Sequence, residues 1–163
     1  MSAPSVRLAD ARDAEAVAGL LVAFRDHLGA DWPSDNAFLA GVERLMDDRE
    51  TDFLLGFLDP DGPPVGIVQL RHRYGVWRAG GDCLVEDVFV TAEARGSGLG
   101  RTLVEAAMQR ARERGARRME LDVNERNEAA LALYGSFGFS ATDNPYGARD
   151  LYLRVHLDAG PDA

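Results

Sequence analysis

The sequence of 163 residues contains no lysine, a single cysteine and no apolar run long enough to cross a membrane. All 18 of its basic residues are therefore arginines, so the chain has no side-chain amine that could be modified. The one cysteine, Cys83, cannot form an internal disulfide, which is typical of a reducing compartment, and its apolar surroundings favour a core residue over a nucleophile. A membrane span needs roughly 18 consecutive apolar residues, so we expect no membrane partner.

The N-terminus also lacks the basic-then-apolar pattern of a secretory leader, because Asp10, Asp13 and Glu15 interrupt it, and we expect a cytoplasmic protein. Basic residues are outnumbered, 18 against 27 acidic residues, which gives a net charge of −9. Nucleic-acid binding requires a basic face, so no nucleic-acid partner is expected, and the acidic balance favours cationic partners instead.

Metal-ligand spacing is absent as well, because no two of His27, His72 and His156 lie at the separation of a metal motif. The composition, with 46% hydrophobic residues, is that of a folded chain. Alternating apolar runs and turn residues predict one α/β domain over residues 1–163, with a frayed tail over 158–163. Strands are expected over about residues 5–9, 51–58, 65–74, 83–90, 117–123, 139–142 and 150–156, and helices over about 11–27, 35–48, 99–114 and 125–137. Asp10 is the expected N-cap of the first helix, and Ser34 or Asp35 that of the second. Residues 79–82, which include two glycines, are expected to form a turn.

The most informative segment is a glycine-rich turn between the strand at 83–90 and the helix that follows it. The apolar run ends in three glycines spaced two apart, Gly96, Gly98 and Gly100. Glycine lets the backbone aim several N–H groups at one point, and a helix start adds unpaired donors and partial positive charge. The segment is therefore predicted to hold a phosphate-bearing ligand. A tight turn without any ligand is the alternative.

Two other phosphate-binding motifs do not fit this turn. The dinucleotide fingerprint G-x-G-x-x-G fails because its sixth position is Arg101 when counted from Gly96 and Leu103 when counted from Gly98. The P-loop fails because its lysine is absent from the chain.

These residues resemble the GNAT superfamily of acyl-CoA-dependent N-acyltransferases. The family signature Q/R-x-x-G-x-G/A is matched by residues 95–100, and the pattern N-x-x-A-x-x-L-Y-x-x-x-G-F is matched by residues 127–139. The order of the predicted elements matches the family over nearly the whole chain. The resemblance implies one N-acetyltransferase domain with a mixed central sheet of about seven strands, helices on both faces and a splayed cofactor cleft.

The resemblance also implies that acetyl-CoA is bound as the acyl donor. Its pantetheine arm would pair like an extra strand with the backbone of Val88, Phe89 and Val90, while Arg95 would shape the turn or contact a phosphate. The backbone amides expected to hold the pyrophosphate are those of Gly96, Ser97, Gly98, Gly100 and Arg101.

Acetyl transfer to an amine requires removal of a proton from the amine and stabilisation of an oxyanion, and Glu86 is the candidate base. Strict alternation would place Glu86 on one face of its strand with Val88, and Asp87 on the other face in a structural role. Apolar neighbours would raise the pKa of Glu86 if the side chain is buried. A carboxylate paired with an arginine or placed at the rim of the sheet is the alternative. The N–H of Val88 is the expected oxyanion donor.

Tyr134 is the candidate acid, and it shares one helical stripe with Asn127 and Ala130 at spacing i, i+3, i+7. The resemblance implies that the Tyr134 hydroxyl approaches the CoA sulfur and that Asn127 contacts the pantetheine arm. The alternative is a tyrosine whose hydroxyl reaches the rim and an asparagine that caps the helix.

The acceptor pocket is expected to involve Asp31, Trp32, Tyr74 and Trp77, with Asp35 and Asp82 nearby. Acids beside aromatic rings suit a cationic amine, although surface acids and core aromatics would give the same pattern. We therefore expect direct attack by a small cationic primary amine on acetyl-CoA in a ternary complex. Acetylation of a protein N-terminus or lysine, or a non-catalytic acyl-CoA-binding domain, remain alternatives. The resemblance also suggests a homodimer.

Overall fold

The structure, a computed structural model, describes residues 2–158, so most of the expected frayed tail, residues 159–163, lies outside the described residues. The chain divides into two compact units, one that ends at Leu121 and one that begins at Asp122. The expectation of one functional domain over the whole chain stays a prediction.

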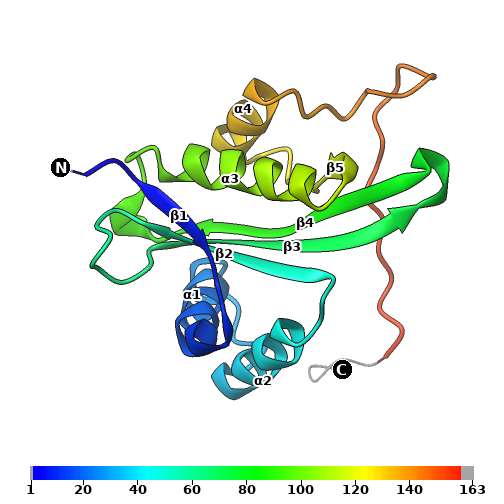
Figure 1. Ribbon diagram of the computed structural model, residues 1–163. Helices are drawn as coiled ribbons and strands as arrows, with labels where there is room; N and C mark the ends of the chain where they lie inside the picture. The colour runs from blue at the N-terminus through cyan, green and yellow to red at the C-terminus, as the bar shows by residue number, and fades with distance from the viewer. Residues whose placement is uncertain (1, 159–163) are drawn as a thin grey trace. The chain divides into compact units, whose positions relative to one another are not determined.

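The first unit is built on a mixed sheet with the strand order β1-β2-β3-β4-β5 (Figure 1). Its first three pairings are antiparallel and the last, between β4 and β5, is parallel. The strands are β1 Ser5–Leu8, β2 Thr51–Phe57, β3 Gly66–Gly75, β4 Gly80–Val90 and β5 Ala116–Glu120. The described residues thus contain five strands where the sequence suggested about seven.

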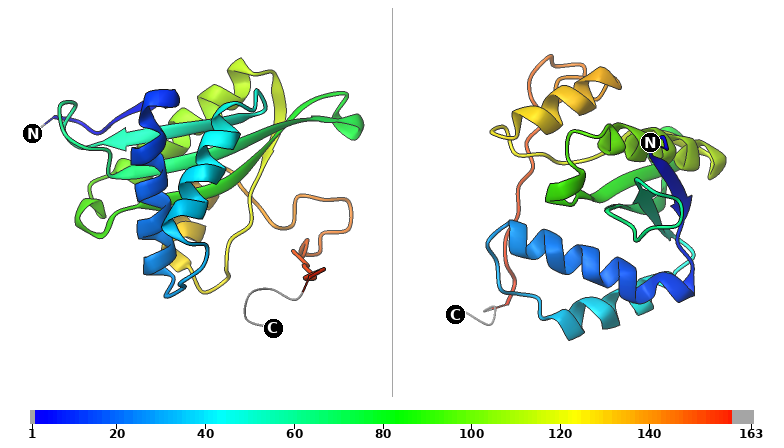
Figure 2. Two further views of the ribbon diagram at one scale, coloured as in Figure 1. Left: turned by 90° about the horizontal axis from the view of Figure 1, so that it is seen from below. Right: turned by 90° about the vertical axis from the view of Figure 1, so that its left-hand side faces the viewer.

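Helices cover both faces of this sheet, as expected. The helices α1, Ala14–His27, and α2, Asp35–Met46, lie side by side on one face, and α3, Leu99–Glu113, lies on the other (Figures 1 and 2). A 3-10 turn, η1 Ala11–Asp13, precedes α1, and Asp10 caps it in a capping box. The cap of α2 is Ser34, one of the two residues expected there.

Two glycines that face each other in the sheet allow the first half of α3 to lie close to it. Gly56 of β2 and Gly66 of β3 are direct register partners. A Cβ added at Gly56 would lie 2.9 Å from Leu99, and one added at Gly66 would lie 2.8 Å from Leu103. Both leucines are fully buried in the apolar cluster beneath α3.

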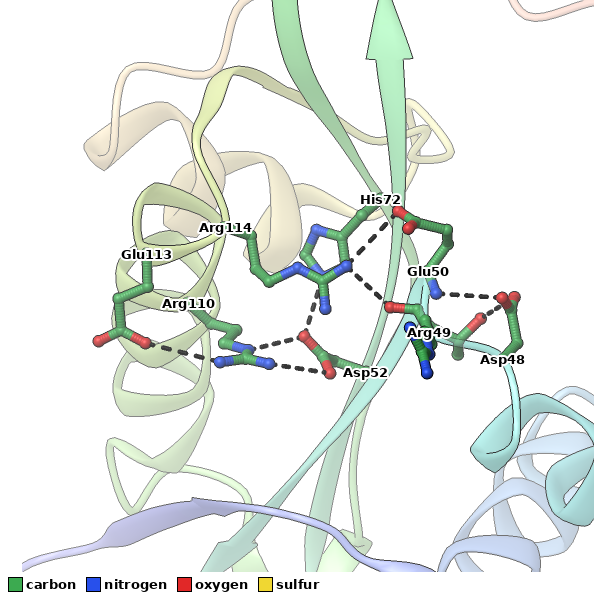
Figure 3. A network of polar contacts seen from close by, with 9 residues as sticks. Asp48, Arg49, Glu50, Asp52, His72, Arg110, Glu113 and Arg114 are labelled. Atoms are coloured by element: carbon green, nitrogen blue, oxygen red, sulfur yellow. Dashed lines mark hydrogen bonds and ion pairs between the residues drawn. The ribbon is translucent and has the colours of Figure 1, made fainter.

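A buried polar network fixes the second half of α3 (Figure 3). The Asp52 carboxylate on β2 contacts His72 Nε2 on β3 at 2.9 Å and accepts bonds from Arg110 on α3 at 2.7 and 3.3 Å. Asp52 and His72 are each 8% exposed. Burying a carboxylate is tolerable here because two nitrogen-bearing side chains satisfy it.

The turn between β3 and β4 is tighter than its sequence suggested. The expected turn ran over residues 79–82, whereas β4 already begins at Gly80, after a 3-10 turn, η2 Val76–Arg78. Gly81 lies within the strand, and a Cβ there would lie 2.7 Å from the carbonyl oxygen of Gly115. The glycine is needed for close approach between β4 and the start of β5, not for a turn.

The second unit contains one helix, α4 Glu128–Ser136, and no strand among its described residues. The strands predicted over 139–142 and 150–156 are therefore wrong for this structure. A single backbone bond, from the Asp150 N–H to the Ala141 carbonyl at 2.8 Å, joins these segments. Asn144 satisfies its side chain within the intervening loop, at Ala148 and Asp150. Alternation of apolar and polar residues indicates which face of a strand would be buried, but it does not show that a neighbouring strand is available for pairing.

Candidate active site

The two parallel strands part halfway along β4. The pairing of β4 with β5 runs only from Gly81 to Leu84. From Val85 to Val90, β3 is the only strand that pairs with β4 among the described residues. The outer edge of this half of β4 therefore offers backbone groups to an extended ligand chain, as in strand addition.

A β-bulge marks the point where the strands part. Gln69 of β3 lies opposite Asp87, and the next residue, Leu70, lies opposite Val85. Glu86 is therefore the extra residue on β4. Bulges of this kind are over-represented next to active sites because they redirect side chains.

The bulge changes which residues share a face. Val85 and Val88 both pack in the cluster beneath α3, although strict alternation would separate them. Phe89 packs in the other cluster, beneath α1. The regular alternation assumed for this strand, which places Val85 and Val88 on opposite faces, is therefore wrong. Glu86 is also exposed, so burial of its side chain is not observed.

Backbone conformation explains the glycine requirement in the turn after β4. Gly96 and Gly98 have φ values of 76° and 87°, in the left-handed region. A Cβ at either position would meet nothing within 4 Å, so crowding is not the reason. The Ser97 hydroxyl stabilises the turn, because it donates to the Ala94 carbonyl at 2.5 Å and accepts from the Leu99 N–H at 3.3 Å.

The N-terminus of α3 is left without a counter-charge of its own. Its N-cap is Gly98, which makes no side-chain capping bond, and its first turn contains no acidic residue. The first N–H groups of a helix have no partner within the helix, and the helix dipole adds positive potential there. This end of α3 can therefore bind an anion.

Two arginines flank this helix end. The Arg95 Nε donates to the Val90 carbonyl at 3.2 Å, and its guanidinium lies 6.0 Å from the centre of the Phe89 ring. This contact connects the turn back to the end of β4, which favours the turn-shaping role. Arg101 is exposed in the first turn of α3.

In the second unit, Tyr134 lies on α4 as expected, whereas Asn127 is the N-cap residue that precedes this helix. The Asn127 side-chain oxygen accepts from the Ala130 N–H at 3.2 Å, so the capping alternative describes this oxygen. The Tyr134 ring meets Phe139 edge-on at 5.8 Å. Burial and, secondarily, the Asp122 charge raise the pKa of Tyr134, which keeps its hydroxyl protonated at neutral pH.

The residues expected around the acceptor do not gather in one place. Asp31 and Trp32 lie exposed in the loop between α1 and α2. Tyr74 and Trp77 are 70% and 97% exposed at the β3–β4 hairpin end. The 11 residues of β4 span roughly 30 Å, which separates that hairpin end from the glycine turn. Asp82 is buried in an ion pair with Arg118 at 2.8 Å.

A contact that the sequence did not reveal brings α1 to β4. Phe24 stacks on Phe89 with ring centres 5.0 Å apart, and His27 lies 6.1 Å from the same ring. Both residues are near the C-terminal end of α1. A helical apolar stripe predicts that Phe24 is buried but cannot name its partner. The loop after α1 therefore starts beside the open half of β4.

The core role of Cys83 is confirmed, because the side chain is fully buried. Burial and then the charges of Asp52 and Asp82 raise its pKa to about 11, which suppresses the thiolate. No group of three metal-binding side chains is found among residues 2–158. None of the helices in that range combines the length and apolarity that a membrane span demands.

Comparison with known proteins gives one consistent family. A model described as the acetyltransferase (GNAT) family matches residues 17–139. An aminoglycoside N(6′)-acetyltransferase type 1 of Stenotrophomonas maltophilia is 31% identical over 160 residues, covering 96% of each protein. A Bacillus subtilis (strain 168) protein named for acetylation of the alanine of ribosomal protein bS18 is 35% identical over 132 residues, covering 81% of this chain and 75% of its own.

A solved structure extends this likeness to the fold. An acetyltransferase from Arthrobacter sp. FB24 superposes with a TM-score of 0.83 at 28% identity, covering 96% of this chain and 97% of that chain.

Proposed function

The chain belongs to the GNAT family of acetyltransferases, and on this premise we propose that it acetylates the primary amine of a small cationic molecule. One observation carries the proposal. The strand with the open outer edge, β4, leads into the turn that ends at the N-terminus of α3, whose first turn has no acidic residue. An extended thioester arm and a diphosphate are the two parts of acetyl-CoA that need these two features, and they are joined in the same order.

The turn after β4 suits the diphosphate. The donors would be the backbone amides of the turn and first helical residues, which carry no carboxylate competitor in that helical turn. The pantetheine arm would then run along Val88, Phe89 and Val90, with the Val88 N–H as the oxyanion donor. The amides proposed for the diphosphate are those of Gly96, Ser97, Gly98, Gly100 and Arg101.

Glu86 would remove a proton from the acceptor ammonium, directly or through a water molecule, so that the neutral amine can attack the thioester. Its position at the bulge supports this role, because a redirected and exposed carboxylate can meet a substrate that arrives from solvent. Tyr134 would protonate the leaving thiolate, and its raised pKa supports a hydroxyl that holds its proton until then. Attack would be direct, without a covalent enzyme intermediate.

A cationic acceptor is favoured by the loop between α1 and α2, which carries Asp31 and Trp32 and starts beside β4. A carboxylate next to an indole attracts an ammonium group by charge and by cation–π contact. The relative named for aminoglycoside acetylation, which the chain matches over 96% of its length, supports the same class. Tyr74 and Trp77 would take part only with an acceptor long enough to reach the hairpin end.

A second candidate is acetylation of a protein α-amine, which is favoured by the relative named for ribosomal-protein alanine. Thiol release from acetyl-CoA, measured with spermidine, an aminoglycoside, free amino acids and an alanine-terminated peptide, separates the two. Turnover with a polyamine or aminoglycoside is expected. Turnover with the peptide alone would replace the first candidate by the second, and no turnover with any amine would contradict both. The cytoplasmic location and a homodimer stay predictions.

A further inference from the structure

We propose that Arg25 is a positioning residue that fixes the loop between α1 and α2, residues 28–34, so that its acidic and aromatic side chains hold the acceptor amine. The inference rests on the proposed function. It concerns a side chain near the end of α1 that no sequence motif singled out.

The guanidinium of Arg25 joins both ends of this loop. Its Nε and Nη2 donate to Asp26 Oδ1 at 2.9 and 2.7 Å, at the end of α1. Its Nη1 donates to the Pro33 carbonyl at 2.7 Å and to Asp35 Oδ1 at 2.8 Å, at the start of α2. The guanidinium also lies 5.9 Å from the centre of the Phe38 ring. The side chain is only 12% exposed, although its carboxylate partners face solvent.

An arginine is required for this arrangement. The planar fork presents donors in several fixed directions, so one side chain can reach a carboxylate on each side of the loop and a carbonyl between them. Lysine carries a compact ammonium on a flexible stem and cannot span the same partners at once. The contacts with Pro33 and Asp35 close the loop from its far end.

The closed loop leaves one carboxylate free to meet a ligand. Arg25 forms ion pairs with Asp26 and Asp35, whereas Asp31 makes no hydrogen bond or ion pair within residues 2–158. The neighbouring Trp32 is 56% exposed. An unpaired carboxylate beside an accessible indole is a recognition pair for an ammonium group.

The loop also starts at the correct place for this task. It follows His27 directly, and the ring of His27 lies 6.1 Å from Phe89 on the open half of β4. Phe24, one turn earlier, stacks on the same ring. The end of α1 thus packs against β4, and Arg25 then fixes the conformation of the loop that follows. Binding of the acceptor, but not of acetyl-CoA, should depend on this arginine.

The test is steady-state kinetics of the full chain carrying Arg25→Met, which keeps an apolar stem against Phe38. Several charge-assisted hydrogen bonds are lost, so the acceptor KM should rise about tenfold or more, with the acetyl-CoA KM within about twofold. Arg25→Lys should restore only part of the effect. Arg12→Met is the matched control, because Arg12 makes the same type of fork with Asp10 at 2.8 Å but touches no loop residue. An unchanged acceptor KM in Arg25→Met, or an equal rise in Arg12→Met, would overturn the proposal.

A second measurement stays informative even if no amine is acetylated. Hydrogen exchange of residues 28–34 should accelerate about tenfold in Arg25→Met, while exchange in β2 and β3 stays unchanged. The amides of Gly29 and Ala30 report on this directly, because they donate to the Asp26 and Arg25 carbonyls at 3.0 and 3.2 Å. Unchanged loop exchange, or a uniform rise across the sheet, would refute the positioning role. If the wild-type protein acetylates none of the amines and loop exchange still accelerates in Arg25→Met, only the proposed function is refuted.

Discussion

Replacing Asp52 by alanine should strongly destabilise the packing of α3 on the sheet. The Asp52 side chain is 9% exposed, and its carboxylate contacts both His72 and Arg110 (Figure 3). Removing one partner of a buried charge pair costs about 3–5 kcal/mol. The Arg110 side chain is 27% exposed and can recover some hydration, so we expect the lower end, about 3 kcal/mol.

Urea unfolding of the full chain, followed by circular dichroism, measures this loss as a lower midpoint at an unchanged slope. The same change should lower the Tm by about 6–12 °C for a chain of this size. Glu113→Ala is the matched control, because Glu113 contacts the same arginine at 3.8 Å from a side chain that is 53% exposed. It should cost about 0.5 kcal/mol or less. A loss below about 1 kcal/mol for Asp52→Ala, or equal losses for both variants, would refute the network's role.

The cost should also depend on pH with a defined sign. Burial acts to raise the pKa of Asp52, but hydrogen bonds from Arg110 and His72 outweigh it and hold the pKa below its usual 3.8. A carboxyl with a lower pKa in the folded state adds stability above its unfolded pKa, and this stability is lost as pH falls through the folded value. The gap between wild type and Asp52→Ala should therefore be full near neutral pH and should shrink below about pH 4. A gap that widens on acidification would contradict this assignment.

Three further variants test the candidate site. Gly98→Val should abolish acetyl-CoA binding in calorimetry, because φ is 87° there and a side chain would disturb the proposed diphosphate turn. Normal affinity in this variant would exclude the turn as the diphosphate site. Gly19→Ala is the control, because a Cβ there meets nothing within 4 Å. Tyr134→Phe should lower turnover about 10²-fold with CoA affinity nearly unchanged, and unaltered turnover across pH would remove the hydroxyl from the mechanism. Glu86→Gln should slow the reaction most at low pH, where the acceptor is protonated, whereas a small uniform loss would indicate a positioning role.

Much of the fold could be predicted from the sequence, because its signals are local. Asp10 and Ser34 indicate the starts of helical segments, and the structure confirms both caps. The glycines at 96 and 98 predict left-handed backbone, and both adopt it. Alternating apolar residues correctly predict the first five strands, apart from shifts of a few residues at their ends.

What the sequence could not give is non-local. The bulge at Glu86 depends on the register between β3 and β4, which no pattern within β4 encodes, and it overturned the assumed alternation. Gly81 was interpreted as a turn residue, although its role is to let Gly115 approach. The alternation at 150–156 suggested a strand, but strand formation requires a pairing partner. The sequence did not indicate a role for Arg25, because its partners Pro33 and Asp35 come close to it only in the folded loop.

The helix α3, at whose N-terminus we propose the diphosphate site, is supported differently at its two ends. Near its start it lies over Gly56 and Gly66, where a Cβ would meet the leucine side chains at 3 Å or less, and near its end it is bound to Asp52. A methyl group at either glycine would act as a wedge under one end only, so the helix axis would tilt instead of shifting as a whole. The direction of the amides proposed to bind the diphosphate thus depends on residues of the sheet on which α3 packs. Evolution or laboratory selection for altered donor affinity can therefore act through these two positions without changing the binding turn.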